Sequence, residues 1–342
     1  MKNKILSVGQ CFSIAILGLI FALSHNLSAE PVEAGFGKIK VNGLMQFWYQ
    51  NDNSATPKDT YRLRRAEIKL SGEIKPEVSW TVMIDPAQVR EDYVSKKDEN
   101  VTSVGRKSVL QDFVVTLKPH KCCSVDFGQY KVPFGIEGLE SSAKLDFVER
   151  SALATQFKWA DYRDIGFTVK GDFKLGNVKI QPAVGLFNVE GQNKLDVNEP
   201  IDFVARLVVK PIEVLHLGLA HYNGKTGTSE TDNFRTGGEI KFVKDPISVY
   251  GEYVTGKSGG KEKHIYYSTG YKISNSFQLV GRYDWYDPDT DKQDDEKHED
   301  TIGLNYFIEK HNAKIQLNYV YRGEKGTKID DDVIMVNLQI SY

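Results

Sequence analysis

The sequence predicts a closed antiparallel β-barrel of about sixteen strands that crosses a membrane. Three observations support this fold class. Segments with a two-residue hydrophobic period recur from Lys38 to the last residue, the connections between them alternate between short and long, and the N-terminus has the pattern of an export signal. An up-and-down barrel places all short turns at one end and all long loops at the other, whereas a Greek-key sandwich has no reason to do so.

Residues 1–29 have the pattern of a signal peptide. Lys2 and Lys4 precede an apolar run over residues 11–23, and small residues around Ala29 follow it. The run is shorter than the roughly 18 residues of a transmembrane helix. We therefore expect an exported mature chain, residues 30–342, that folds as one barrel domain.

The strands are expected where apolar and polar residues alternate. Helical periodicity is confined to a short stretch around Ser141–Thr155. The predicted strands are 38–50, 60–74, 78–87, 108–117, 123–131, 163–173, 177–188, 201–209, 214–222, 233–243, 246–257, 262–273, 276–287, 299–308, 312–322 and 332–342.

Every second connection is short, as in "KPE" at 75–77, "KPIE" at 210–213 and "KDP" at 244–246. The intervening connections are mostly longer and polar, and the longest of them is Val132–Tyr162. A membrane sheet of this kind must close, because an open edge would leave unpaired backbone groups in hydrocarbon.

The two faces of each strand have opposite polarity. Leu317 and Tyr319, for example, alternate with Gln316 and Asn318. In a membrane barrel the apolar face meets lipid and the polar face lines the interior, the reverse of a soluble protein. Trp80, Trp285 and Tyr342 lie near strand ends with outward parity, as an interfacial aromatic girdle requires.

The stretch "YRLRRAEIKLSGEI" (Tyr61–Ile74) places Arg65, Glu67 and Lys69 on the interior face. By simple alternation Arg62 and Arg64 have outward parity at the loop end of the strand. There they are expected to meet lipopolysaccharide phosphates, a neighbouring subunit or solvent.

Charge and cysteine content exclude some classes of function. Without Lys2 and Lys4 the 44 Lys and Arg residues fall to 42, against 46 acidic residues, a net charge of −4. No basic excess indicates a nucleic-acid partner. After processing only Cys122 and Cys123 remain; they cannot form a disulfide framework, and a turn feature, a vicinal bond and an intermolecular bond all stay open.

Two stretches resemble the phosphate-selective porin O and P family of bacterial outer membranes. One is "YRLRRAEIKLSGEI", and the other is "FGQYKVPFGIE" (Phe127–Glu137) followed by "LDFVERSAL" (Leu145–Leu153). The resemblance implies an outer-membrane barrel of sixteen strands, usually a homotrimer in contact with lipid and lipopolysaccharide. Its third long loop, Val132–Tyr162, would fold inward and narrow the pore.

Basic groups at such a constriction would favour anions. The expected constriction residues are Lys131, Lys144, Arg150 and Lys158, and the expected pore-lining residues of the wall are Arg65, Lys69, Arg206, Arg235, Lys241, Arg282 and Arg322. Interior parity also assigns eight acidic residues, among them Glu67, Glu239 and Asp284, against twelve basic ones. Because these charges are mixed, we expect a preference for anions and do not assign phosphate specificity.

No motif indicates an enzyme, a cofactor or a metal site. The six mature histidines are scattered, and the acidic stretch Asp287–Asp300 lacks the Gly and Glu positions of an EF-hand loop. "GKSGGKEK" (Gly256–Lys263) lacks the P-loop spacing and is expected to be a hairpin tip.

The sequence thus predicts a passive diffusion channel for small hydrophilic solutes. The alternative is a barrel with a closed interior whose loops act as a surface adhesin or anchor, and an outer-membrane hydrolase ranks last.

Overall fold

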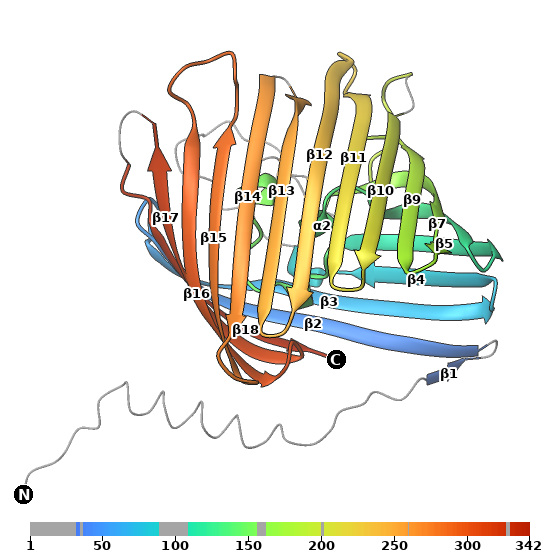
Figure 1. Cartoon of the computed structure of the whole chain (residues 1–342), viewed down its shortest axis with the longest axis horizontal. Coiled ribbons are helices and arrows are strands. Elements are labelled where there is room, and N and C mark those ends of the chain that lie inside the picture. Colours follow the sequence, from blue (N-terminus) through green and yellow to red (C-terminus); the bar gives the residue numbers. More distant parts are fainter. Residues whose placement is uncertain are drawn as a thin grey trace, which may run out of the picture. The chain divides into compact units, whose positions relative to one another are not determined.

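The computed structural model describes residues 32–34, 37–88, 109–155, 162–199, 202–258, 260–325 and 329–342. Within them the chain is almost entirely β-sheet (Figure 1). The predicted signal peptide and the predicted strand start at 108 lie outside the described residues, and the strand predicted over 78–87 ends at Ile84, because a single helical turn begins at Pro86. The strands are β1 (Val32–Ala34), β2 (Gly37–Asp52), β3 (Asp59–Lys75), β4 (Val78–Ile84), β5 (Leu110–His120), β6 (Cys123–Lys131), β7 (Arg163–Gly171), β8 (Phe173–Leu175), β9 (Val178–Phe187), β10 (Asp202–Ile212), β11 (Leu215–Thr226), β12 (Thr231–Lys244), β13 (Ile247–Ser258), β14 (Gly260–Lys272), β15 (Phe277–Asp287), β16 (Lys297–Glu309), β17 (Ala313–Glu324) and β18 (Val333–Ser341).

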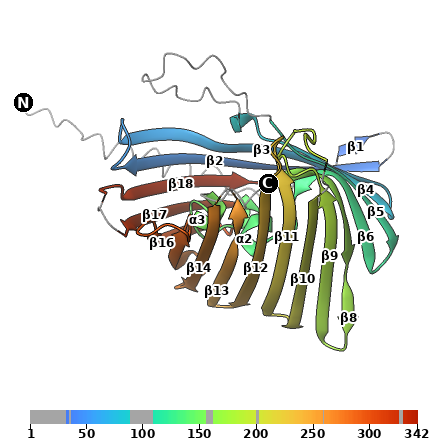
Figure 2. The same ribbon diagram turned by 90° about the horizontal axis from the view of Figure 1, so that it is seen from above.

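Each strand pairs antiparallel with the next, and β18 pairs with β2, which closes the sheet into a barrel (Figures 1 and 2). β7 and β8 are one strand interrupted at Asp172, because both pair with β9. The short β1 pairs beside the start of β2. Over the described part of the chain the barrel therefore has sixteen strands, and this prediction is confirmed.

The reversed polarity is also confirmed. Leu219 and Ile302, on the apolar face, are each 65% exposed, whereas Asn318 and Asn337, on the polar face, are 1% and 0% exposed. A soluble sheet would bury the first pair and expose the second. The apolar face is therefore the outside of the barrel and the polar face its interior.

The helical segments are single turns: η1 (Pro86–Gln88), α2 (Ile136–Leu139), η2 (Ser142–Lys144) and α3 (Ala152–Thr155). The short helix predicted around Ser141–Thr155 is therefore only partly present. Between η2 and α3 the chain is irregular, and side chains of the barrel wall bind several of its backbone groups in place of helical hydrogen bonds. None of the described helices is long and apolar enough to cross a membrane.

Candidate functional site in the barrel interior

A β-bulge at Arg64 decides how the arginines of β3 are arranged. Gln46 on β2 pairs with Arg65, but the next residue, Phe47, pairs with Leu63. Arg64 is thus an extra residue without a partner on β2, and the parity of β3 changes across it. Leu63 is 63% exposed on the outer face, which places its neighbour Arg62 on the inner face.

The predicted outward parity of Arg62 and Arg64 is therefore wrong. Their guanidinium groups lie 4.6 and 5.3 Å from the ring centre of Trp48, an interior residue that is fully buried. Arg64 also forms an ion pair of 3.1 Å with Glu149 of the long connection. A one-residue bulge reverses the face of every side chain beyond it, and strict alternation could not reveal this.

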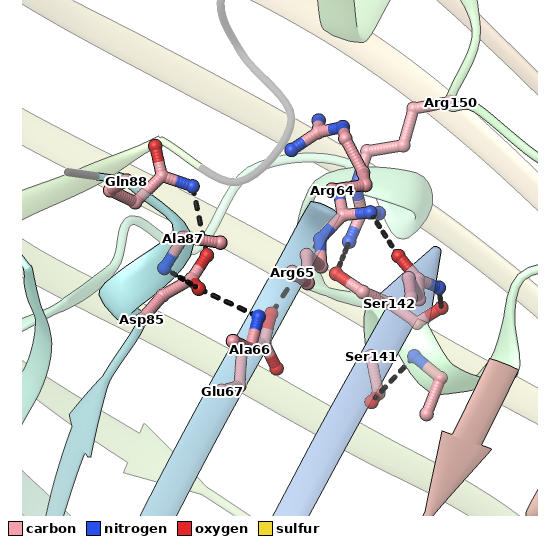
Figure 3. A network of polar contacts seen from close by, with 12 residues as sticks. Arg64, Arg65, Ala66, Glu67, Asp85, Ala87, Gln88, Ser141, Ser142 and Arg150 are labelled. Carbon is pink, nitrogen blue, oxygen red and sulfur yellow. Dashed lines mark hydrogen bonds and ion pairs between the residues drawn. The ribbon is translucent and has the colours of Figure 1, made fainter. Parts of the chain in front are cut away.

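Arg65 lies on the other side of the bulge and is 3% exposed. It donates to Gln46 at 2.7 Å and lies 3.6 Å from Glu67 (Figure 3). Asp85, after β4, accepts the backbone N–H of Ala66 at 2.8 Å. A carboxylate thus satisfies a backbone donor next to the bulge, where the regular ladder is interrupted.

The segment Ile136–Thr155 of the long connection is bound by polar side chains of the wall. The donors and acceptors come from β2, β15, β16, β17 and β18, and all belong to the interior face. Side-chain donors bind backbone carbonyls of the segment: Gln46 binds Ser142 at 3.5 Å, Gln339 binds Ala143 at 2.9 Å and Lys314 binds Leu145 at 2.6 Å. Gln316 and Asn305 both donate to the Asp146 carbonyl, at 3.0 and 2.7 Å, and Arg282 donates to the Glu149 and Arg150 carbonyls at 3.0 and 3.2 Å. Two side chains are acceptors: Asn318 accepts the backbone N–H of Val148 at 2.7 Å, and Asp284 that of Ala152 at 3.0 Å. At about 1 kcal/mol net for each bond, these contacts stabilise this path of the segment by several kcal/mol.

Lys314 is an interior cation that the sequence analysis missed. It is 0% exposed, bonds to the Leu145 carbonyl and lies 3.3 Å from the Nδ1 atom of His311. The signal was present, because Lys314 continues the polar series of Gln316 and Asn318. Nearby, burial raises the pKa of the Asp146 carboxyl above its ordinary value.

The four predicted constriction residues do not form one group. Arg150 is 3% exposed and donates to the carbonyls of Glu137 and Glu140 and to Ser142, so that it holds the connection together. Lys131 donates to the same Glu140 carbonyl at 2.9 Å. Lys144 is exposed, and Lys158 lies outside the described residues.

Most predicted cations of the wall have a carboxylate partner. Lys241 lies 3.0 Å from Glu140; burial alone would raise the pKa of this carboxyl, but Lys241 outweighs it and holds the pKa below its ordinary value. Lys69, on β3, is half-buried. The other pairs are Arg206 with Glu239, Arg235 with Glu262, Arg282 with Asp284 at 2.6 Å and Arg322 with Glu299 at 3.2 Å.

A cavity of about 740 Å³ opens at the turn end of β5–β10. Lys131 at the end of β6 lines it, together with Pro133 and Leu139 of the long connection. Five Lys or Arg residues line the cavity against three acidic ones: Lys118, Lys121, Lys131, Lys170 and Arg206 against Glu77, Asp126 and Asp172. This part of the interior therefore combines open space with an excess of positive charge.

An apolar cluster fills part of the interior near the loop ends of β6 and β9–β14. Tyr222 and Val204 are fully buried in it, Phe187 is 1% exposed, and Val132 and Leu153 of the long connection pack against them. These interior positions were not predicted, because apolar residues were assigned to the lipid face.

Cys122 lies in the turn before β6 and Cys123 begins the strand, and both thiols are free. Across the described ranges no three His, Cys, Asp or Glu side chains are grouped as metal ligands would be.

Comparisons with known proteins agree with this architecture. The family model for "phosphate-selective porin O and P" matches residues 39–241, more than half of the chain. No curated protein matches the sequence significantly.

Solved structures of bacterial outer-membrane proteins share the fold at low sequence identity. OmpF of Salmonella typhi, in complex with daunomycin, is 11% identical with a TM-score of 0.66, over 92% of this chain and all of that one. The anion-selective porin from Comamonas acidovorans is 11% identical with a TM-score of 0.61, over 90% of this chain and all of that one. The trimer form of OmpT from Vibrio cholerae is 11% identical with a TM-score of 0.58, over 90% of this chain and 99% of that one.

The closed sixteen-stranded barrel with a polar interior and an apolar exterior is the architecture of a porin, and the family model covers both the arginine-rich strand β3 and the long connection. The chain therefore belongs to the phosphate-selective porin O and P family of the bacterial outer membrane.

Proposed function

We propose that this outer-membrane diffusion channel prefers small anions, and that they pass along the β5–β10 side of the interior. The observation that carries the proposal is the cavity of about 740 Å³ with its excess of basic residues. On the opposite side Arg282 and Arg322 are paired with carboxylates. At the cavity Lys170 and Arg206 are paired as well, with Asp126 and Glu239, so the proposal rests on the excess of basic over acidic lining residues.

The proposal includes an inward position for the long connection Val132–Tyr162, which would narrow the pore. The support is chemical: the side chains that bind Ile136–Thr155 come from five strands and have interior parity. The predicted constriction residues then differ in their roles; they are Lys131, Lys144, Arg150 and Lys158. Lys131 adjoins the cavity directly, whereas Arg150 acts by holding the fold of the connection.

We further propose a homotrimer in contact with lipid and lipopolysaccharide, and passage without covalent chemistry. A trimer form is known for the similarly folded OmpT of Vibrio cholerae. Chemical cross-linking of the detergent-folded barrel should trap three subunits; cross-linking that stops at one would refute this part.

Anion preference is tested by single-channel recording of the refolded mature chain in a planar bilayer under a KCl gradient. We expect discrete steps and an anion-selective reversal potential. The triple variant Lys118→Gln, Lys121→Gln, Lys170→Gln should lower the ratio of anion to cation permeability roughly threefold or more, because it removes charge from the cavity.

The matched control is Lys225→Gln, Lys257→Gln, Lys261→Gln, which removes the same charge at the loop ends of the strands. It should leave the reversal potential nearly unchanged. Equal effects of the two triple variants, or a cation-selective wild type, would refute the proposed path. Addition of phosphate at constant chloride then tests whether phosphate is bound more tightly than other anions.

One observation favours the alternative of an occluded barrel with a surface role. The apolar cluster around Tyr222 and Phe187 lies in the interior, where a wide channel would have polar groups. The same recording separates the two functions, because a correctly folded barrel without steps would support the occluded form.

A further inference from the structure

A lysine stands at the beginning of every tight turn. Seven tight turns join the strands at one end of the barrel. In each case the lysine is one of the last three residues of the preceding strand or directly follows that strand. These residues, here called the lysine ring, are Lys75, Lys118, Lys174, Lys210, Lys244, Lys272 and Lys310. With Lys121 the turn segments hold eight lysines, against four acidic residues, Glu77, Glu213, Asp245 and Glu309.

The lysine ring is exposed and weakly paired. Lys210 is half-buried and the other six are exposed. Lys272 lies 2.7 Å from Asp245, and Lys118 lies 3.9 Å from Glu73. The other five form no ion pair with any residue that the structure describes: Lys75, Lys174, Lys210, Lys244 and Lys310.

The loop end of the barrel differs. Five of its lysines each lie within 3.1 Å of a carboxylate: Lys225 with Glu230, Lys257 with Asp232, Lys261 with Asp291, Lys292 with Asp289 and Lys325 with Glu296. The positive charge of these residues is therefore neutralised within the protein, and that of the lysine ring is largely available to a partner.

Six of the seven ring lysines lie within two residues of a large apolar side chain that is exposed on the barrel. Leu175 is 73% exposed beside Lys174, and Ile74 is 60% exposed beside Lys75. The others are Leu117 (39%), Val243 (41%) and Ile273 (57%) beside Lys118, Lys244 and Lys272, and Ile212 (55%) two residues after Lys210. Six of the seven turns thus combine a group that favours hydrocarbon with a cation that favours the polar boundary.

We propose that the lysine ring binds the phosphate groups of anionic phospholipids in the membrane leaflet that faces the turns. In outer-membrane barrels the short turns face the periplasm, so this is the inner leaflet. A lysine near an anionic leaflet contributes about 1 kcal/mol, which corresponds to a roughly fivefold preference for an anionic over a zwitterionic headgroup at each site.

A cell-wall polymer with acidic peptides is the other anionic partner at this end of the barrel. The phospholipid is favoured because the lysines are spread around the whole circumference and lie close to exposed apolar residues, whereas a bound polymer would need one contiguous surface. Lipid binding by the lysine ring is independent of the proposed anion path, because the five ring members without an ion pair do not line the cavity.

The test compares two variants with the same loss of charge at opposite ends of the barrel. The turn variant changes Lys75, Lys174, Lys210, Lys244 and Lys310 to Gln; the loop variant changes Lys225, Lys257, Lys261, Lys292 and Lys325 to Gln. The detergent-folded barrels are mixed with phosphatidylglycerol and phosphatidylcholine of equal chain length, and the retained lipids are counted by native mass spectrometry at low salt.

We expect the wild type and the loop variant to retain phosphatidylglycerol about fivefold more than phosphatidylcholine, and the turn variant to lose most of this preference. Heat-modifiability on gels confirms that each barrel has folded. Equal retention of both lipids by the wild type, or equal loss in both variants, would overturn the proposal. So would a turn variant that keeps its lipid preference but no longer binds purified peptidoglycan.

Discussion

The two sides of the barrel interior use the same alternation of residues for different tasks. On the side of β15–β18 and β2, buried amides and paired charges bind the long connection. On the side of β5–β10, exposed and half-buried lysines line a cavity. The polar residues of the first side bind the connection, whereas those of the second side line open space, where Lys170 and Arg206 are each paired with a carboxylate.

Interior parity alone therefore does not identify a pore-lining residue. Arg282 and Lys170 both have interior parity, but Arg282 is 6% exposed and bonds to two backbone carbonyls of the connection. Lys170 has one carboxylate partner and borders the cavity. Arg282 is thus a structural residue of the interior, and Lys170 is a candidate for contact with the solute.

The largest effect is expected from Arg282→Gln. Arg282 pairs with Asp284, lies 3.8 Å from Glu137 and covers the ring of Phe147 at 4.7 Å. Its loss leaves two poorly compensated interior carboxylates, a cost of about 3–5 kcal/mol for a buried pair. We expect the connection to detach from β15, with higher and noisier single-channel conductance and faster proteolysis between Glu137 and Thr155.

The control for this prediction is Arg322→Gln. Arg322 also pairs with a glutamate, Glu299, but its side chain is 29% exposed and it forms no described contact with the connection. The conductance noise of the Arg322→Gln channel should resemble that of the wild type. If Arg322→Gln and Arg282→Gln give the same noise, the contacts of Arg282 do not hold the connection.

Strand alternation predicted most of the fold because a period of two is a local property of the sequence. β6 was predicted at 123–131 and is observed at Cys123–Lys131. The closure of sixteen strands followed from even numbering and from the cost of an open edge in lipid. Both arguments need no knowledge of which residues face each other.

The site was harder to predict because it depends on register. The bulge at Arg64 leaves the composition of β3 unchanged and becomes visible only when Leu63 is seen opposite Phe47. In the same way Arg235 was expected to face the pore, and its partner Glu262 lies on β14, two strands away in the barrel. Apolar interior residues such as Tyr222 were missed because they break the rule by which the lipid face was assigned.

A smaller effect is expected from Gln316→Leu. The Gln316 amide donates to the carbonyls of Leu145 and Asp146 and accepts from Asn337. Leucine keeps much of the volume but leaves these buried groups with fewer partners, at a cost of about 1–3 kcal/mol. The thermal midpoint of the folded barrel should fall, and conductance noise should rise less than in Arg282→Gln. The control Gln50→Leu removes only a bond to Asp52 at 3.2 Å, and an equal fall in its midpoint would contradict this role of Gln316.

The smallest effect concerns Glu149, where the bulge meets the connection. Burial alone would raise the pKa of the Glu149 carboxyl, but Arg64 and Arg65 outweigh it and hold the pKa below the ordinary value of 4.5. A carboxyl with a lowered pKa stabilises the folded state above its ordinary pKa, and this contribution is lost as the pH falls through the lowered value. The ion pair with Arg64 is partly exposed and contributes at most about 1 kcal/mol.

Acidification below pH 4.5 should therefore loosen the connection near Arg64 in the wild type, and hydrogen exchange of residues 145–152 should rise. Glu149→Gln cannot lose this charge, so its exchange should be higher at neutral pH and should change less on acidification. The bulge makes the prediction specific, because Arg64 reaches Glu149 only when it points into the barrel. Deletion of Arg64 restores simple alternation in β3 and should abolish the pH dependence in the same way. A wild type and a deletion variant with the same acid response would show that another carboxyl, such as Asp146 or Glu140, controls the release of the connection.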